Sequence, residues 1–244
     1  STLMRSSAAS DVYKRQVRYS ETDADAKLSV VGMMNYLQDC STFHSEDSGV
    51  GLFHLEKEKK IWLLSSWQIK IYRRPSLGET ITTATWPYGF KGIFGMRNFA
   101  IYDRERRPLL LADSNWFLMD TENGRPLRVT EEDLKPYGEP GERLPMEEAG
   151  RKILLPEEMV QCSSLWVMAH QIDTNHHVNN AQYVEMAREA LPKPMEIGEI
   201  RAEYRKAAVL GDEIKVFAAR CPGGYVVSLQ DGNCLLYTSD AADD

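Results

Sequence analysis

The sequence lacks long apolar runs and lacks an excess of positive charge. No run of about 18 consecutive apolar residues occurs, so we predict no membrane-spanning helix. The mean hydropathy of -0.42 agrees with this prediction. Acidic residues outnumber basic ones by 36 to 29, giving a net charge of -7. Nucleic-acid binding needs a surplus of Lys and Arg to contact phosphates, so we expect no nucleic-acid partner.

Cysteine is scarce, and ligand-binding motifs are missing. The chain has no CxxC pair and only four cysteines, namely Cys40, Cys162, Cys221 and Cys234. A small secreted protein held by disulfides has a higher density, so we expect reduced thiols and a cytoplasmic location. The sequence shows neither the Cys/His/Asp spacing of a metal site nor a Gly-rich phosphate loop. We therefore expect no metal and no cofactor.

Both ends differ from the rest of the chain. Residues 1–16 show neither an apolar stretch nor a clear helical period, and residues 237–244 break off where a strand should continue. Both segments resemble translated adapter sequence. We expect 1–16 to be a non-native or disordered leader and 237–244 to be a non-native tail, and we leave both out of the fold prediction.

The first half of the remaining chain reads as one helix followed by strands. Apolar residues recur at helical spacing after Ser29, a typical N-cap, and the pattern stops near Gly49. Segments rich in β-branched and aromatic residues then fill residues 62–120, separated by turn sequences. A long helix followed by antiparallel strands predicts an α+β unit in which a sheet wraps the helix.

The second half repeats this order. A polar turn precedes a helix that Asn179 can cap, and strand-like segments follow it. The sequence Leu77-Gly78-Glu79 returns as Leu210-Gly211-Asp212, and Asp23 and Asp173 hold the same place before their helices. Two tandem units of one fold therefore fit the sequence better than two unrelated domains.

The repeat sets the expected domain boundaries. We place an N-terminal unit at 17–125 and a C-terminal unit at 161–236, whose last strand we expect to be truncated. Residues 126–160 lose periodicity and collect Pro, Gly and Glu, apart from a short helix that begins after Thr130. We expect this segment to connect the two units.

A polar cluster stands at the start of the second helix. Asp173, Asn175 and His177 alternate, so an extended backbone would point all three to one side. The helix start adds unpaired N–H groups and a partial positive charge, which suit a carbonyl oxygen that becomes negative during acyl transfer. A carboxylate, an amide and an imidazole can together orient and deprotonate a water molecule. The cluster thus indicates a hydrolytic site.

Each of these residues taken alone has a simpler explanation. Asp and Asn cap turns, and histidines are common in solvated loops. The corresponding turn of the first half reads DADAKLSV, with Asp25 opposite Asn175 and Lys27 opposite His177. Because the catalytic residue types occur together in one turn only, we predict one working site and one degenerate site.

The segment DTNHHVNNAQYVEMA is similar to the D-x-N-x-H-V-N-N-x-x-Y signature of plant and bacterial acyl-acyl carrier protein thioesterases. AEYRK resembles their following strand, and the similarity extends over residues 17–235. The resemblance implies a double hotdog fold and hydrolysis of fatty acyl thioesters on acyl carrier protein. The oligomeric state stays open between a monomer and a homodimer. It also implies catalytic roles for Asp173, Asn175 and His177.

The sequence departs from plant members at one place. Where those carry Glu and Cys, this chain has Ala207 and Ala208, which excludes a cysteine nucleophile there and leaves direct attack by water. We expect Glu203 to replace the missing carboxylate if it shares a strand face with Ala207. A charge on a solvated or interfacial strand explains Glu203 equally well. The supporting residues we consider are Asn179, Asn180 and Glu203.

Two other functions stay open. An acyl-CoA thioesterase would use the same scaffold, and the two alanines are also compatible with a non-catalytic acyl-binding protein. Basic clusters offer contacts for an acidic carrier protein, although solvated strand edges explain them equally well. These clusters are Arg73-Arg74, Arg104-Arg106-Arg107 and Arg201-Arg205-Lys206.

Overall fold

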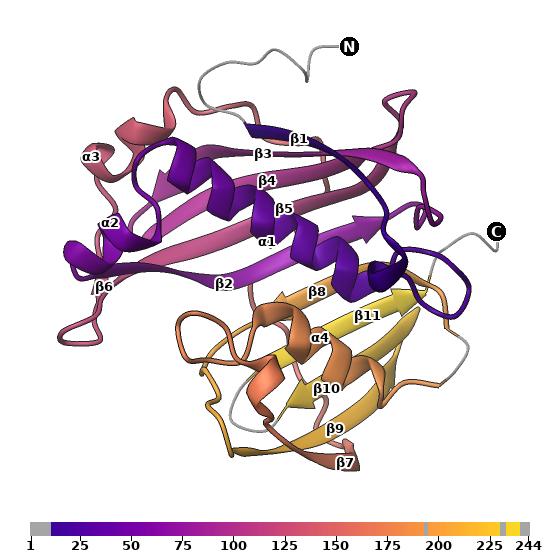
Figure 1. Ribbon diagram of the computed structural model, residues 1–244. Helices are drawn as coiled ribbons and strands as arrows, with labels where there is room; N and C mark the ends of the chain where they lie inside the picture. Colours follow the sequence, from indigo (N-terminus) through magenta and orange to yellow (C-terminus); the bar gives the residue numbers. More distant parts are fainter. Residues whose placement is uncertain (1–10, 193–194, 230–232, 240–244) are drawn as a thin grey trace. The chain divides into compact units, whose positions relative to one another are not determined.

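The computed structural model describes residues 11–192, 195–229 and 233–239. The chain divides into two compact units: unit 1 runs to Leu64 and resumes over 72–147, and unit 2 contains 65–71 and the chain from 148 onward. Each unit combines helix with antiparallel sheet, which confirms the predicted α+β class (Figure 1). Among the helices of the described ranges, none is long and apolar enough to cross a bilayer.

In unit 1 the predicted long helix and its sheet are both present. Helix α1 (Val30–Asp47) is capped by Ser29, whose Oγ accepts the Gly32 N–H at 2.9 Å. Past its end, Gly49 takes a left-handed φ of 74°, a conformation that glycine adopts without strain. The sheet order is β1-β3-β4-β5, with β6 beside β5. The bounds are β1 Asp11–Gln16, β3 Thr80–Lys91, β4 Phe94–Tyr102, β5 Pro108–Asp120 and β6 Pro126–Leu127, and short helices are α2 Leu52–Lys57 and α3 Glu131–Leu134.

The core of unit 1 lies between α1 and one face of this sheet. Met33, Leu37 and Cys40 of α1 are fully buried, and the Cys40 thiol lies 3.9 Å from the Thr83 carbonyl of β3. Phe99 of β4, paired in register with Thr85, is fully buried as well. Burial of each large apolar side chain contributes about 1.5–3 kcal/mol, so this contact fixes α1 on the sheet.

The predicted connection covers the opposite face of the unit 1 sheet. Leu144 and Met146 pack into a buried cluster with Trp86 and other residues of β3 and β4. The Leu144 N–H donates to Asn98 Oδ1 at 2.8 Å, and the Trp86 ring N–H donates to the Glu142 carbonyl at 2.8 Å. Much of the segment 126–160 therefore belongs to the folded units. In unit 2, Ile153 and Met159 pack against Val226 in the same manner.

The leader prediction is wrong for residues 11–16. They form β1, which pairs with β3 from Asp11 opposite Thr85 to Gln16 opposite Thr80. The strand looks polar because it is an edge strand whose inner side chains pack on α1: the Tyr13 ring lies 5.3 Å from that of Phe43. Residues 1–10 lie outside the described residues. At the other end, 237–239 belong to β11, and 240–244 lie outside the described residues.

Unit 2 repeats the arrangement with a shorter helix. Helix α4 (Asn180–Arg188) packs against a sheet of order β2-β8-β11-β10-β9-β7, in which 65–71 of β2 pair with β8. The strands are β2 Lys60–Ile71, β7 Val160–Trp166, β8 Ile197–Glu203, β9 Glu213–Cys221, β10 Gly224–Leu229 and β11 Asn233–Ser239. Short 3-10 turns, η1 Tyr19–Glu21 and η3 Ala169–Gln171, precede the two main helices.

One histidine is buried in unit 1. His44 of α1 is 3% exposed, and its Nδ1 lies 2.9 Å from Arg97 Nη1. Because a guanidinium only donates, Nδ1 accepts and the neutral ring carries its proton on Nε2. Burial, followed by the charge of Arg97, lowers the pKa of His44 from 6.5 to about 4. The folded chain thus holds this ring neutral at pH 7.

This shift predicts a loss of stability in mild acid. The unfolded ring takes up its proton near pH 6.5 while the folded ring stays neutral down to about 4. The His44 contribution is therefore complete above pH 6.5 and disappears as the pH falls to about 4, reducing the free energy of unfolding by up to about 3 kcal/mol. Denaturant unfolding at several pH values measures it. His44→Gln should flatten the slope in this window, whereas His54→Gln, at an exposed position, should keep it; equal slopes in both variants would contradict the assignment.

Candidate functional site

The polar cluster of unit 2 forms a closed turn. The Asp173 N–H donates to the His177 carbonyl at 2.8 Å, and the His176 N–H donates to the Asp173 carbonyl at 3.0 Å. Our prediction of an extended backbone is therefore wrong for these residues. Asp173 Oδ1 accepts the Asn175 N–H at 2.8 Å, and His176 has a left-handed φ of 61°. An aspartate that bonds the backbone two residues further on favours a turn over a strand.

Exposure nevertheless alternates along the turn. Asp173, Asn175 and His177 are partly buried, whereas Thr174 and His176 between them are exposed. Within the described part of the chain, the side chains of Asn175 and His177 form no hydrogen bond or ion pair. An amide and an imidazole that are partly shielded and uncommitted can bind a ligand.

The start of α4 is already capped. Asn179 Oδ1 accepts the Ala181 N–H at 2.9 Å, and the Asn179 carbonyl accepts the Gln182 N–H at 2.9 Å. We expected unpaired N–H groups here, but these two are engaged within the cap. Asn179 therefore acts as a cap, and the Asn180 carbonyl accepts the Tyr204 hydroxyl at 3.0 Å. The N–H groups of Ala181 and Gln182 are therefore not available to a reacting carbonyl.

Three aromatic residues that sequence reasoning did not assign hold this region in place. The Tyr183 hydroxyl accepts the Ala208 N–H at 2.8 Å, while the Ala208 carbonyl accepts the Val178 N–H at 2.9 Å. The ring N–H of Trp67 donates to the Tyr204 hydroxyl at 3.2 Å. Ala208 thus contributes its backbone to the site. No pattern in the sequence marks these contacts, because they join residues far apart in the chain.

Unit 1 contains the same turn. The Asp23 N–H donates to the Lys27 carbonyl at 2.9 Å, and Asp23 Oδ1 accepts the Asp25 N–H at 3.0 Å. The Leu28 N–H donates to the Pro75 carbonyl at 2.8 Å, as the Val178 N–H does to the Ala208 carbonyl. The hydrogen bonds therefore confirm the predicted internal repeat.

The aspartates of the two turns also differ in their nearest cation. Since Pro75 corresponds to Ala208, Arg74 corresponds to Ala207. Arg74 forms an ion pair with Asp23. Burial alone would raise the pKa of Asp23, but the hydrogen bond and charge of Arg74 bring it below its usual value. Asp173 forms no ion pair in the part of the chain that the structure describes. Its carboxylate therefore lacks, among the described residues, the neutralising partner that Arg74 provides for Asp23.

Glu203 is engaged elsewhere. Strand β8 ends at Glu203, so Ala207 lies beyond the strand and the predicted shared face does not exist. The Glu203 carboxylate accepts the Ile153 N–H at 2.9 Å and two N–H groups of Arg205 at 3.1 Å each. Burial opposes ionisation, but these bonds hold the pKa of Glu203 below its usual value. The residue therefore serves to fasten the 148–153 segment to β8.

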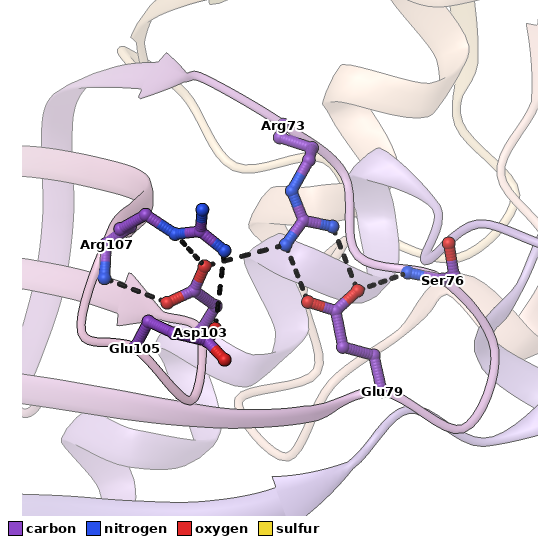
Figure 2. Close-up of polar contacts among 6 residues, drawn as sticks. All are labelled: Arg73, Ser76, Glu79, Asp103, Glu105 and Arg107. Atoms are coloured by element: carbon purple, nitrogen blue, oxygen red, sulfur yellow. Dashed lines mark hydrogen bonds and ion pairs between the residues drawn. The ribbon is translucent and has the colours of Figure 1, made fainter.

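Arg73 and Arg107, from two of the basic clusters, are paired with acidic neighbours in unit 1. Arg73 forms two hydrogen bonds with Glu79, at 2.9 and 2.6 Å, and Arg107 bonds Asp103 at 2.8 Å and Glu105 at 3.3 Å (Figure 2). These charges are satisfied within the unit. These two arginines are consequently weak candidates for attracting an acidic partner.

Family models match both units. The model described as the acyl-ACP thioesterase N-terminal domain matches residues 10–137, and that described as the C-terminal domain matches residues 156–235. A palmitoyl-acyl carrier protein thioesterase of Gossypium hirsutum is 25% identical over 78% of this chain and 50% of its own length. One from Cuphea hookeriana is 26% identical over 88% of this chain and 58% of its own length. The chain thus spans about half the length of the curated relatives it matches.

Solved structures share the fold. An acyl-ACP thioesterase of Bacteroides thetaiotaomicron superposes with a TM-score of 0.83 at 22% identity, covering 94% of this chain and 97% of that one. A 12:0-ACP thioesterase of Umbellularia californica gives 0.81 at 19% identity, covering 94% and 96%. At this identity the likeness concerns the fold, and it confirms the predicted double hotdog.

Removing the Glu203 charge should destabilise unit 2. Glu203→Gln weakens charge-assisted bonds to Arg205 and the Ile153 N–H in a largely buried place, at a cost of about 1–3 kcal/mol. Urea unfolding measures this cost. Glu213→Gln, on the exposed start of β9, is the matched control and should change stability by less than about 0.5 kcal/mol. If both variants unfold at the midpoint of the native chain, Glu203 does not fasten the segment.

Proposed function

Because this chain belongs to the acyl-acyl carrier protein thioesterase family, we propose that it hydrolyses the thioester between a fatty acyl chain and acyl carrier protein. The products are a free fatty acid and the carrier thiol. The names of the curated relatives support the proposal, since they describe thioesterases of acyl carrier protein. The observation that carries it is the turn of unit 2, where Asp173 lacks the arginine that neutralises Asp23.

Water is the proposed nucleophile. Its oxygen adds to the thioester carbonyl carbon, and its proton passes to Asp173 or His177. The amide of Asn175 donates to the carbonyl oxygen while that oxygen is negative. When the tetrahedral intermediate collapses, the C–S bond breaks and the leaving sulfur receives the proton. With Ala207 and Ala208 after β8, no cysteine is available there to form an acyl-enzyme.

The turn holds the carboxylate of Asp173 in a defined orientation. The Asn175 N–H fixes Asp173 Oδ1 at 2.8 Å, which leaves the second carboxylate oxygen for water or an imidazole. Tyr183 and Val178 hold the Ala208 backbone from two sides. Such a preset arrangement lowers the reorganisation that the reaction requires.

We also propose a cytoplasmic location and a monomer or homodimer. The free thiols of Cys40, Cys162 and Cys221 support a reducing compartment. Mass measurement in solution decides the oligomeric state, and labelling of the protein in intact cells decides the location.

Matched substrates separate the alternatives. Hydrolysis of one acyl chain presented on carrier protein and on CoA should give a higher kcat/KM with the carrier. A clear preference for CoA would replace the proposed substrate with an acyl-CoA. Tight binding of the acyl chain without turnover of either thioester would identify a non-catalytic acyl-binding protein.

Removing the charge of Asp173 should abolish most activity. In Asp173→Asn the side-chain oxygen can still accept the Asn175 N–H, so the turn should persist and stability should change by about 1 kcal/mol or less. The kcat should fall by at least about 100-fold because proton transfer to the carboxylate is lost. Steady-state kinetics measure this fall. Asp23→Asn in unit 1 is the matched control and should keep its kcat; comparable losses in both would reduce Asp173 to a turn-forming residue.

An arginine introduced at position 207 should lower the rate of hydrolysis. Ala207→Arg places a guanidinium where Arg74 stands in unit 1, and we expect it to pair with Asp173 and lower kcat at least about tenfold. Ala207 is exposed, so the larger side chain should not prevent folding. Ala207→Gln, which adds bulk without charge, should retain most activity. If the two variants have the same kcat, pairing with the carboxylate does not matter.

A further inference from the structure

Unit 2 exposes a group of large apolar side chains beside the candidate site. Trp166, Met168, Val209 and Leu210 are 63%, 58%, 44% and 60% exposed. We call these four residues the apolar corner. Exposed apolar groups cost solvation free energy, and a concentrated set of them is typical of an interaction surface.

Backbone hydrogen bonds hold the corner together. The Val167 N–H donates to the Asp212 carbonyl at 2.9 Å, and the Gly211 N–H donates to the Val167 carbonyl at 3.2 Å. Trp166 pairs in register with Glu213, where β7 and β9 lie side by side (Figure 1). The segments 166–168 and 209–213 therefore form one local surface.

Unit 1 builds the same backbone with a different surface. The Val17 N–H donates to the Glu79 carbonyl at 2.9 Å, and the Gly78 N–H donates to the Val17 carbonyl at 2.9 Å. At the four equivalent positions, however, unit 1 carries Gln16, Arg18, Ser76 and Leu77. The fold thus tolerates polar residues at three of these positions, so its stability does not explain the apolar corner.

The corner borders both ends of the Asp173 turn. Met168 directly precedes η3 (Ala169–Gln171), which leads into Asp173. Val209 directly follows Ala208, whose backbone is bonded to Val178 and Tyr183. The apolar corner therefore accompanies the turn with the catalytic residue types, whereas three of the four equivalent positions are polar beside the turn that Arg74 neutralises.

We propose that the apolar corner is the surface on which the acyl carrier protein docks; this inference rests on the proposed function. A thioester carried on a flexible arm reaches the turn only if its protein binds close by. Exposed Trp and Met are enriched in the centres of protein interfaces. Lys206, exposed just before Ala207, places a positive charge at the rim that suits an acidic partner.

Exchanging the corner for its unit 1 counterpart tests this assignment. The triple variant Trp166→Gln, Met168→Arg, Val209→Ser introduces residues that the same backbone already carries in unit 1. Two substrates are compared: an acyl chain on carrier protein, and the same chain on N-acetylcysteamine, which has the thioester without the protein. We expect KM for the carrier substrate to rise about tenfold and KM for the small thioester to stay unchanged. Leu77→Ser, on the unit 1 corner, is the matched control and should change neither.

Binding measurements make the outcome independent of turnover. Native and triple-variant chains are titrated with carrier protein that bears a non-hydrolysable thioether analogue of the acyl chain. If neither thioester is hydrolysed but the analogue binds to the corner, the proposed function fails and docking stands. An unchanged KM and unchanged binding overturn the docking proposal, as do equal losses with both thioesters.

Two other results, each showing a different partner at the apolar corner, would also overturn the docking proposal. If the triple variant changes only the mass in solution, the corner joins two copies of the chain. If it changes only cosedimentation with phosphatidylglycerol vesicles, the corner meets a lipid surface. Should the triple variant unfold, Met168→Arg alone keeps the test, with thermal unfolding as the check on folding and the same criteria.

Discussion

The candidate site depends on one local hydrogen bond, from a backbone N–H to the aspartate side chain two residues before it. This bond closes the turn in both units, at Asp23 and at Asp173. The turn in each case leads the chain into the main helix of its unit. A side-chain oxygen that accepts this N–H is therefore part of the turn in both copies, and the carboxylate that carries it is neutralised by an arginine in unit 1. Arg74 and Ala207, which lie outside the turn, make that difference, and we propose that it helps to separate a structural aspartate from a reactive one.

Much of the fold was predictable from the sequence because it follows from local patterns. Ser29, Gly49 and the strand segments obey capping, turn and β-branched preferences, and the structure confirms them. One error arose from a tertiary contact and the other from a local side-chain bond. Residues 11–16 look polar but pair with β3, and the extended reading of residues 173–177 ignored the bond that an aspartate makes to its own turn. Contacts between distant residues, such as that of Tyr183 with Ala208, leave no local signature at all.

The segment between the units is held in place by buried residues of both units. Its apolar side chains cover the outer sheet faces, and its backbone is fixed by buried polar groups, Asn98 in unit 1 and Glu203 in unit 2. A carboxylate near the site is thereby committed to holding the chain in place. The sequence alone left Glu203 as a candidate in the reaction, whereas in the structure its carboxylate is bonded to Arg205 and to the Ile153 N–H.

Strand β1 bears on how this protein should be produced. A chain shortened to begin at Val17 would lose the partner of β3 along 80–85. The exposed row of N–H and C=O groups would then be open to strands of other molecules, which favours aggregation during expression. Helix α1 would also lose the aromatic contact of Phe43 with Tyr13. A chain expressed from residue 17 onward, because its first residues look non-native, would therefore lack the edge strand that covers β3.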